Sequence, residues 1–197
     1  MRTSRLEAFS DAVLAIIITI MVLELHVPEG NSLEALRVST GSSLLTYLLS
    51  FVYIGIYWNN HHHMFQVTEA VNGGVLWANL HLLFWLSLYP FTTAWMDETD
   101  FARTPLVIYG VNLLAAAIAF FVLQQAIFRC PGGDRLRTAL GRDLKGKLSP
   151  LIYLAGILMA FVSPWLAVAC YVAVAVIWLV PDRRVERFVM QSQDEAA

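Results

Sequence analysis

The side chains best able to do chemistry lie in the first third of the sequence. Asp11 and Glu24 flank an apolar stretch, and three consecutive histidines occupy positions 61–63. Histidine can bind a metal or haem. Consecutive helical residues point about 100° apart, however, so three rings in a row cannot all bind one ion. The sequence therefore predicts no metal site and no cofactor. It leaves the histidines either in an interhelical polar network or exposed at a membrane interface.

No catalytic arrangement accompanies these groups. Ser10 and Asp11 are adjacent and face different directions on a helix, so a nucleophile paired with a base has no support beyond residue type. The sequence has neither the TVGYG segment of carbonyl-lined potassium filters nor a helix with regularly spaced arginines for voltage sensing. We therefore expect a protein that is not an enzyme.

Composition places the chain in a bilayer. Only 14% of the residues are charged and 58% are hydrophobic, whereas soluble domains carry about 25% charged residues. The segments Thr104–Phe128 and Val71–Met96 contain no charged residue, and each exceeds the roughly 20 residues that cross a membrane. The sequence therefore predicts an all-α, polytopic membrane protein that contacts lipid and binds no nucleic acid.

Hydrophobic patterning predicts six membrane helices in one unit that spans residues 1–197. The expected segments are residues 5–26, 44–65, 72–95, 104–128, 150–162 and 165–180. The last two come from one apolar stretch, which would be about 51 Å long as a single helix and which Ser163-Pro164 interrupts. Six crossings place all lysines and arginines except Arg37 and Arg103 on one side. That side is expected to be cytoplasmic and to hold both termini, in a cell membrane.

The first helix differs from the others because acidic residues lie inside it. Only 12 residues separate Asp11 from Glu24, which is about 18 Å of helix and too short to cross a bilayer against lipid. Ionisable groups in membrane segments usually face the bundle interior or a water-filled cavity. The sequence therefore predicts that protein and water enclose this helix. It either lines a pore or lies centrally in a bundle without one.

One face of the first helix carries an apolar stripe. Ile16, Ile20 and Leu23 follow helical spacing, and Thr19 borders them with a hydroxyl group. Such a stripe is ordinarily a packing seam. Around the axis of an oligomer, the same stripe would form rings of bulky side chains that constrict a pore. Asp11 lies about 140° around the helix from Ile16 and is expected to point into its own bundle.

Several motifs together resemble a known family. Residues 5–11 read RxxxFSD, the second helix carries Trp58-x-x-His61-His62-x-x-Phe65, and the third carries Asn79 and the segment 89–91, Tyr-Pro-Phe. The chain thereby resembles the short prokaryotic form of the transmembrane protein 175 family, the endolysosomal-type potassium channels. His63 is an addition to the usual histidine pair. Helices four to six match the family in number and length only.

The resemblance implies a potassium-selective or potassium-favouring channel that conducts passively and assembles as a homotetramer with its first helices around a central pore. It implies that Ile16, Ile20 and Leu23 form the constriction, with Thr19 close to the layer that determines selectivity. It also implies a structural network around the first helix. Its members are Arg5, Phe9, Ser10, Asp11, His61 and Asn79.

Two further expectations concern the outer side and the alternative function. Glu24 lies about 40° from Ile20 on a helix, so we expect it closest to the axis in a negatively charged outer mouth that concentrates cations. The alternative to a channel is a proton- or ion-coupled secondary transporter that uses Asp11, His61 and Asn79 as a relay. Pro90 and Pro164 lie near expected helix ends, which argues against the broken helices of many transporters.

Overall fold

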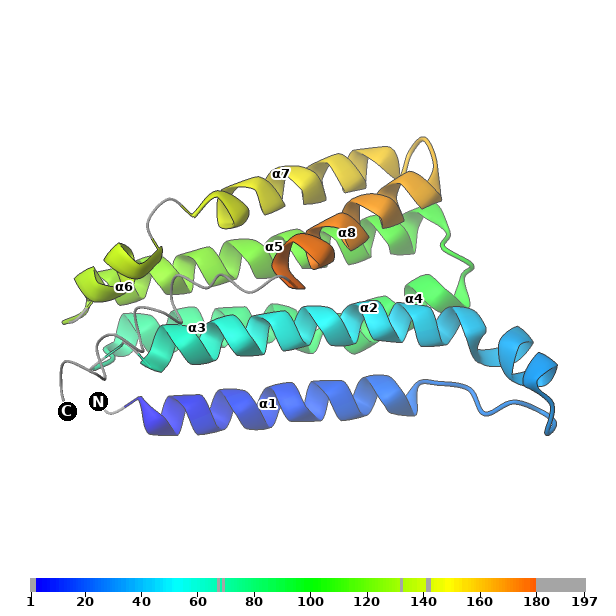
Figure 1. Ribbon diagram of the computed structural model, residues 1–197, viewed down its shortest axis with the longest axis horizontal. Coiled ribbons are helices and arrows are strands. Elements are labelled where there is room, and N and C mark those ends of the chain that lie inside the picture. Colours follow the sequence, from blue (N-terminus) through cyan, green and yellow to red (C-terminus); the bar gives the residue numbers. More distant parts are fainter. Residues whose placement is uncertain (1–2, 67, 69, 132, 141–142, 180–197) are drawn as a thin grey trace.

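The computed structural model describes residues 3–66, 68, 70–131, 133–140 and 143–179. Within these residues the chain forms eight α-helices and no strand (Figure 1). The helices are α1 (Ser4–Leu23), α2 (Leu33–Gln66), α3 (Gly73–Ser87), α4 (Tyr89–Glu98), α5 (Arg103–Phe128), α6 (Gly133–Leu140), α7 (Leu144–Met159) and α8 (Pro164–Leu179).

The long helices lie side by side and run between two ends of the bundle (Figure 1). Four spans are long and apolar enough to cross a membrane: α1, α2, α3 together with α4, and α5. The helices α7 and α8 have 16 residues each and form an antiparallel pair against α5. The chain is therefore a multi-pass, all-helical membrane protein in the part that the structure describes.

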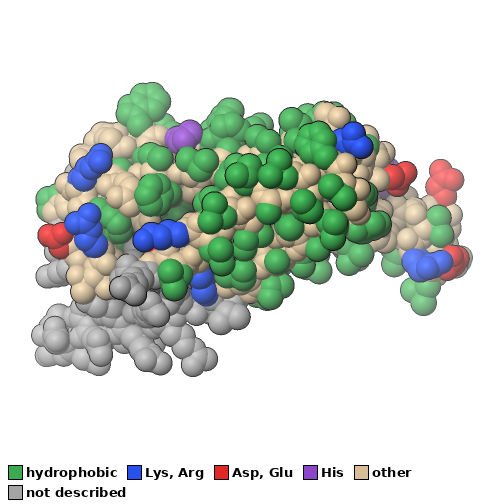
Figure 2. All heavy atoms as spheres, turned by 90° about the horizontal axis from the view of Figure 1, so that it is seen from above, with side chains coloured by type: hydrophobic (Ala, Val, Ile, Leu, Met, Phe, Trp, Pro, Cys, Tyr) green, Lys and Arg blue, Asp and Glu red, His purple; other side chains and the backbone are tan. Residues whose placement is uncertain are grey.

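Charge separates the two ends of this bundle. Figure 2 shows Lys and Arg gathered mainly towards the end where α1 begins, Asp and Glu mainly towards the other, and hydrophobic side chains between them. We call the first the basic end; its described basic side chains are Arg5, Arg129, Arg137, Lys145 and Lys147. The opposite, acidic end holds Glu24, Glu29, Glu34, Asp97, Glu98 and Asp100, with Arg37 and Arg103. Arg2, Arg142, Arg183, Arg184 and Arg187 lie outside the described residues, and so does the side chain of Arg135.

α2 begins at Leu33, earlier than the expected residue 44. Ser32 starts it, because the Ser32 side chain accepts a hydrogen bond from the Ala35 backbone N–H at 3.1 Å, which satisfies one of the free donors of the first turn. Its 34 residues amount to about 51 Å of helix, so the first turns project beyond the other helices at the acidic end (Figure 1). Residues 33–43 include charged and hydroxyl side chains, so hydrophobic patterning did not predict a helix there.

The third expected segment is broken. α3 ends at Ser87 and α4 begins at Tyr89, because Pro90 has no N–H to donate to the Leu86 carbonyl and its ring crowds that carbonyl. The segment 72–95 was expected to be one helix and is two, with Pro90 in the first turn of the second. The break after Ser87 lies well inside the span Gly73–Glu98.

The C-terminal segments keep the expected break but not all expected ends. α7 ends at Met159 and α8 begins at Pro164, so the interruption lies where the Ser163-Pro164 pair predicted it. α7 begins at Leu144 and not at residue 150, because the Asp143 side chain caps it by accepting from the Gly146 N–H at 2.8 Å. The short helix α6 lies in the segment that was expected to be a loop. Residue 180, the last of the sixth expected segment, lies outside the described residues.

α5 is the centre of the bundle. It packs against α3 and α4 on one side and against α7 and α8 on the other. Several of its side chains have no exposed surface: Leu106, Tyr109, Leu113, Ala116, Ala119, Leu123 and Ile127. Gly110 allows the close approach of α8, because a Cβ atom there would overlap the Tyr171 hydroxyl and the Ile157 side chain. This core fixes α3, α4, α7 and α8 and leaves α1 at the edge.

The α1 face and the network behind it

α1 contacts only the first part of the bundle. It packs against α2, α3 and α4 and lies at the edge away from α7 and α8 (Figure 1). The seam it buries follows a spacing of three or four residues, as one face of a helix must. Its members are Leu6, Ser10, Leu14, Ile17 and Met21. This seam completes the packing of α1 inside its own subunit.

The apolar stripe found from the sequence lies on a different face. Ile16 is 56% exposed, Ile20 41% and Leu23 80%, and Thr19 is also exposed. The Thr19 hydroxyl donates to the Ile16 carbonyl at 2.8 Å, so it is satisfied within the helix. The stripe is therefore not a packing seam within this chain, and its residues are uncovered in the described structure.

A buried hydrogen-bonded chain ties α1 to α2 and α3. The Asn79 side-chain N–H donates to the Ser10 hydroxyl at 2.9 Å, and the Asn79 carbonyl oxygen lies 2.8 Å from Nε2 of His61. The Ser10 hydroxyl in turn donates to the Leu6 carbonyl at 2.9 Å. At most 2% of the surface of Ser10, Asn79 or His61 is exposed. Buried polar groups with complete partners fix one geometry, so this chain orients α1 on the bundle.

Asp11 lies beside this chain and bonds to a residue that the sequence analysis did not assign to it. Its carboxylate accepts from the Trp58 indole N–H at 3.0 Å, and the Trp58 ring stacks on His62 with centroids 5.9 Å apart. Asp11 is exposed in the single subunit. It therefore points towards α2, away from the stripe that holds Ile16.

The other members expected in the network stand apart. Arg5 is exposed and makes no ion pair among the residues that the structure describes, and Phe9 is 52% exposed. Both follow the spacing of the stripe, because Phe9 lies seven residues before Ile16 and Arg5 four residues before Phe9, so they extend it towards the basic end. The structure thus joins Ser10, Asn79 and His61, and leaves Arg5 and Phe9 on the open face of α1.

The acidic end of α1 adjoins a small cavity. Glu24 directly follows α1 and is exposed. With Met21, Ser43, Thr93 and Asp97 it lines a cavity of about 20 Å³ between α1, α2 and α4. The Ser43 hydroxyl donates to one Asp97 carboxylate oxygen, and the other oxygen is buried without a partner among the described residues. Sequence reasoning grouped Asp97 with the loop acids and missed its place inside α4.

The three histidines behave separately, as their helical directions require. His61 joins the buried chain, and His62 stacks on Trp58 and lies 2.8 Å from the Gln66 side chain. Nδ1 of His63 is buried without a hydrogen-bond partner in the described part of the chain. No group of three metal-binding side chains comes together among the described residues.

These observations define a class before they define a family. The chain is a multi-pass helical membrane protein in which one apolar helix is held to the bundle by buried polar bonds and keeps an apolar face uncovered. Its residues 5–90 match the family described as the endosomal/lysosomal potassium channel TMEM175. It is 50% identical over 193 residues to the potassium channel HX13_20290 of Chryseobacterium sp. (strain P1-3), which covers 98% of this chain and 100% of that protein. The chain belongs to the TMEM175 family.

Two further similarities extend this finding. A crystal structure of a lysosomal potassium-selective channel TMEM175 homolog from Chamaesiphon minutus matches with a TM-score of 0.73 and 30% identity, covering 90% of this chain and 96% of that one. The endosomal/lysosomal proton channel TMEM175 of Danio rerio is 31% identical over 127 residues, which is 62% of this chain and 24% of that protein. The family comprises ion channels, which are not enzymes.

Proposed function

We propose that this chain forms a passive, potassium-favouring cation channel in which four copies surround a pore lined by α1. The observation that carries the proposal is the uncovered stripe of α1. Ile16, Ile20 and Leu23 are exposed although the opposite seam of the same helix is fully packed. The names of the bacterial relatives supply potassium as the ion.

Around a fourfold axis the stripe forms stacked apolar rings. Rings of bulky apolar side chains exclude water from a narrow pore and thereby close it to ions. The pore conducts when the rings move apart and water enters. Thr19 lies between the Ile16 and Ile20 levels and is the polar group closest to this constriction. Ser10, Asn79 and His61 hold α1 on the side opposite the stripe. Arg5 and Asp11 are charged residues of α1 itself, near the basic end.

Orientation follows from the distribution of charge. The basic end faces the cytoplasm of a cell membrane, and α1 begins there. α8 runs back towards the basic end (Figure 1), which supports six crossings, with α3 and α4 counted as one, and both termini in the cytoplasm as part of this proposal. The acidic end then forms the outer mouth, where Glu24 and its neighbours raise the local concentration of cations. We propose one such unit for residues 1–197.

The first experiment is ion flux from purified protein in liposomes. We expect passive potassium efflux down its gradient, larger than sodium efflux under the matched gradient, without a coupled ion. Efflux that requires an opposing proton or sodium gradient would contradict the channel and support a coupled transporter. Equal absence of potassium and sodium efflux, with folded protein in the membrane, would contradict both.

The central position of α1 has its own test. In a background of Cys130→Ser and Cys170→Ser, an oxidant should cross-link subunits through Leu23→Cys. Leu151→Cys is the matched control, because Leu151 is 64% exposed on α7 but lies far from α1. Cross-linking through residue 151 and not through residue 23 would place α1 at the periphery.

Proton permeation is a second candidate function. The vertebrate relative named above is described as a proton channel. The structural observation that favours it is a hydroxyl-rich seam on α2, where Thr40, Ser43, Thr46, Ser50, Tyr53 and Tyr57 are buried on the face that ends at His61. Hydroxyl groups both donate and accept, so they can pass protons along a hydrogen-bonded file.

A further inference from the structure

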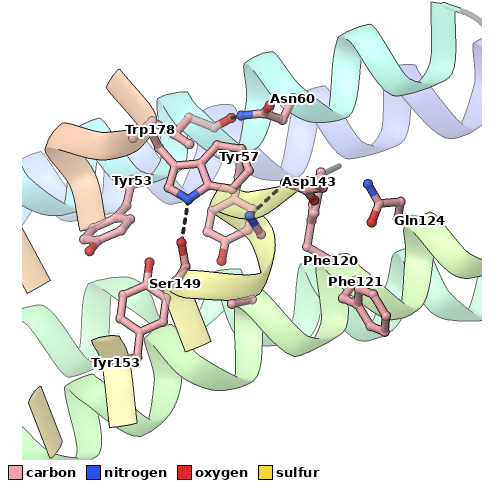
Figure 3. A pocket seen from close by; sticks show the side chains of 13 residues that line it. Tyr53, Tyr57, Asn60, Phe120, Phe121, Gln124, Asp143, Ser149, Tyr153 and Trp178 are labelled. Atoms are coloured by element: carbon pink, nitrogen blue, oxygen red, sulfur yellow. Dashed lines mark hydrogen bonds between the residues drawn. The ribbon is translucent and has the colours of Figure 1, made fainter. Parts of the chain in front are cut away.

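Two cavities enter each subunit from opposite ends. The inner cavity, of about 50 Å³, lies between α2, α5, α7 and α8, and Asn60, Gln124 and Asp143 line it towards the basic end (Figure 3). The outer cavity is the one of about 20 Å³ beside Asp97. A water needs about 10–15 Å³ of such space and polar partners, so the inner cavity has room for a few waters and the outer cavity for one.

Tyrosine hydroxyls form the deep end of the inner cavity. Tyr53, Tyr57 and Tyr153 line it from α2 and α7 (Figure 3), and the Tyr53 hydroxyl donates to the Tyr171 carbonyl at 2.5 Å. The Ser149 hydroxyl accepts from the Trp178 indole N–H at 2.8 Å and closes one side. The wall is therefore polar where the cavity reaches the middle of the bundle.

Serine and threonine hydroxyls lead to the outer cavity. Ser50 lies 2.7 Å from the Thr93 hydroxyl and 3.1 Å from the Tyr109 hydroxyl, and all three residues are buried. Thr93 and Thr46 both line the outer cavity with Asp97. The hydrogen bonds of Tyr109, Ser50 and Thr93 thus lead to a cavity that the Asp97 carboxylate also lines, and a water in that cavity would complete the path to Asp97.

Tyr89 joins the two halves. Its ring lies between those of Tyr53 and Tyr109, with centroids 6.3 Å from each, and its hydroxyl faces that of Tyr57 outside the geometry of a well-formed hydrogen bond. Tyr89 has no exposed surface, and its hydroxyl makes no hydrogen bond to the described residues. A buried hydroxyl rarely stays unpaired, so this group is expected to bond to water between the cavities.

We propose that each subunit carries a proton pathway through its own helix bundle, from the inner cavity past Tyr57 and Tyr89 to Ser50, Thr93 and the outer cavity, separate from the α1 pore. This inference rests on the second candidate function. At each hydroxyl, one proton arrives on an oxygen lone pair and the proton already present leaves to the next acceptor. No tyrosine is ionised and no proton is consumed, so the flow follows the gradient.

Size excludes potassium from this pathway. A potassium ion needs several oxygen ligands in place of its hydration shell, and cavities that hold a few waters, separated by a packed tyrosine layer, supply no continuous shell. A proton moves by exchange of hydrogen bonds and needs no open channel. The two ions are therefore separable by substitution, because they use different residues.

The test is proton flux into liposomes that contain a pH-sensitive dye, driven by a pH gradient at equal potassium on both sides. Valinomycin in every sample fixes the potassium permeability, so the proton pathway limits the signal. Tyr89→Phe removes only a hydroxyl that makes no bond to the described residues, and we expect it to lower proton flux by about tenfold. Potassium flux without valinomycin should be unchanged, which also shows that the variant folds.

Two controls separate the route from the pore. Tyr171→Phe removes a buried hydroxyl that donates to the Leu106 carbonyl at 3.3 Å. Tyr171 lines neither cavity, so this variant should leave proton flux unchanged. Ile16→Trp should lower potassium flux and leave proton flux unchanged. If Ile16→Trp lowers proton flux and Tyr89→Phe leaves it unchanged, protons cross through the α1 pore and the inference is wrong. Wild-type proton flux no greater than that of empty liposomes would overturn the inference without affecting the potassium channel.

Discussion

α1 and α5 are both apolar helices long enough to cross a membrane, with mean hydropathies of 2.2 and 2.5, yet their surroundings differ. α5 is packed on opposite sides by four other helices and forms the centre of the subunit. α1 is packed on one side only and keeps Ile16 and Leu23 uncovered. Helices of the same chain therefore hold α5 from two sides, whereas they hold α1 from one side and leave its other side to contacts outside the chain.

The largest effect should come from opening the stripe of α1. Ile16→Ala shortens a side chain of the proposed constriction, so wetting becomes easier and potassium flux from liposomes should rise by about tenfold or more. Ile118→Ala is the matched control, because Ile118 is 47% exposed on α5 in the same apolar band. Equal flux in the two variants would remove the distinction between the helices.

A smaller effect should come from filling the tight contact between Gly110 of α5 and the helices packed against it. Gly110→Ala places a methyl group against the Tyr171 hydroxyl and Ile157, and overpacking of this kind costs about 1–3 kcal/mol. Gly55→Ala on α2 meets no atom within 4 Å, so it should leave the melting temperature unchanged or raise it. Thermal unfolding in detergent measures both variants. Similar melting temperatures of the two variants would show that the contact around Gly110 tolerates a methyl group and is not tightly packed.

A slightly smaller loss of stability should come from removing the hydrogen bonds that hold α1 to the bundle. Asn79→Leu removes the bonds to Ser10 and His61 and should cost about 1–2 kcal/mol of stability, together with a change in potassium flux because α1 loses its support. Asn60→Leu is the control, since among the described residues the Asn60 side chain donates only to the Ile56 carbonyl of its own helix. A stability loss without any change in flux would separate the buried chain from the pore.

The smallest effect should come from the charge at the acidic end of α1. Glu24→Gln should lower single-channel conductance by about twofold at low ionic strength and little at high ionic strength, because salt screens an exposed charge. Glu34→Gln is the control, because Glu34 is paired with Arg37 at 3.0 Å on the projecting part of α2. Equal conductance of wild type and Glu24→Gln would exclude Glu24 from the mouth.

The helix break after Ser87 and the cavity beside Asp97 could not be predicted from the sequence. A proline inside an apolar segment signals a break, but whether the helix ends or only bends depends on the packing around Leu86 and Tyr89. The acids of residues 97–100 read as a turn, because nothing in the sequence reveals that Ser43 of another helix donates to Asp97. Contacts between helices distant in sequence have no local signal.

The sequence by itself determined that this protein is helical and lies in a membrane, and that Ile16, Ile20 and Leu23 share a face of the first helix. Hydropathy and the period of 3.6 residues are local properties, so no tertiary information was needed. Only the tertiary structure decided that this face is uncovered, that Asn79 joins Ser10 to His61, and that Asp11 turns to Trp58. These facts depend on which helices become neighbours, and the many packing contacts of the core fix that choice.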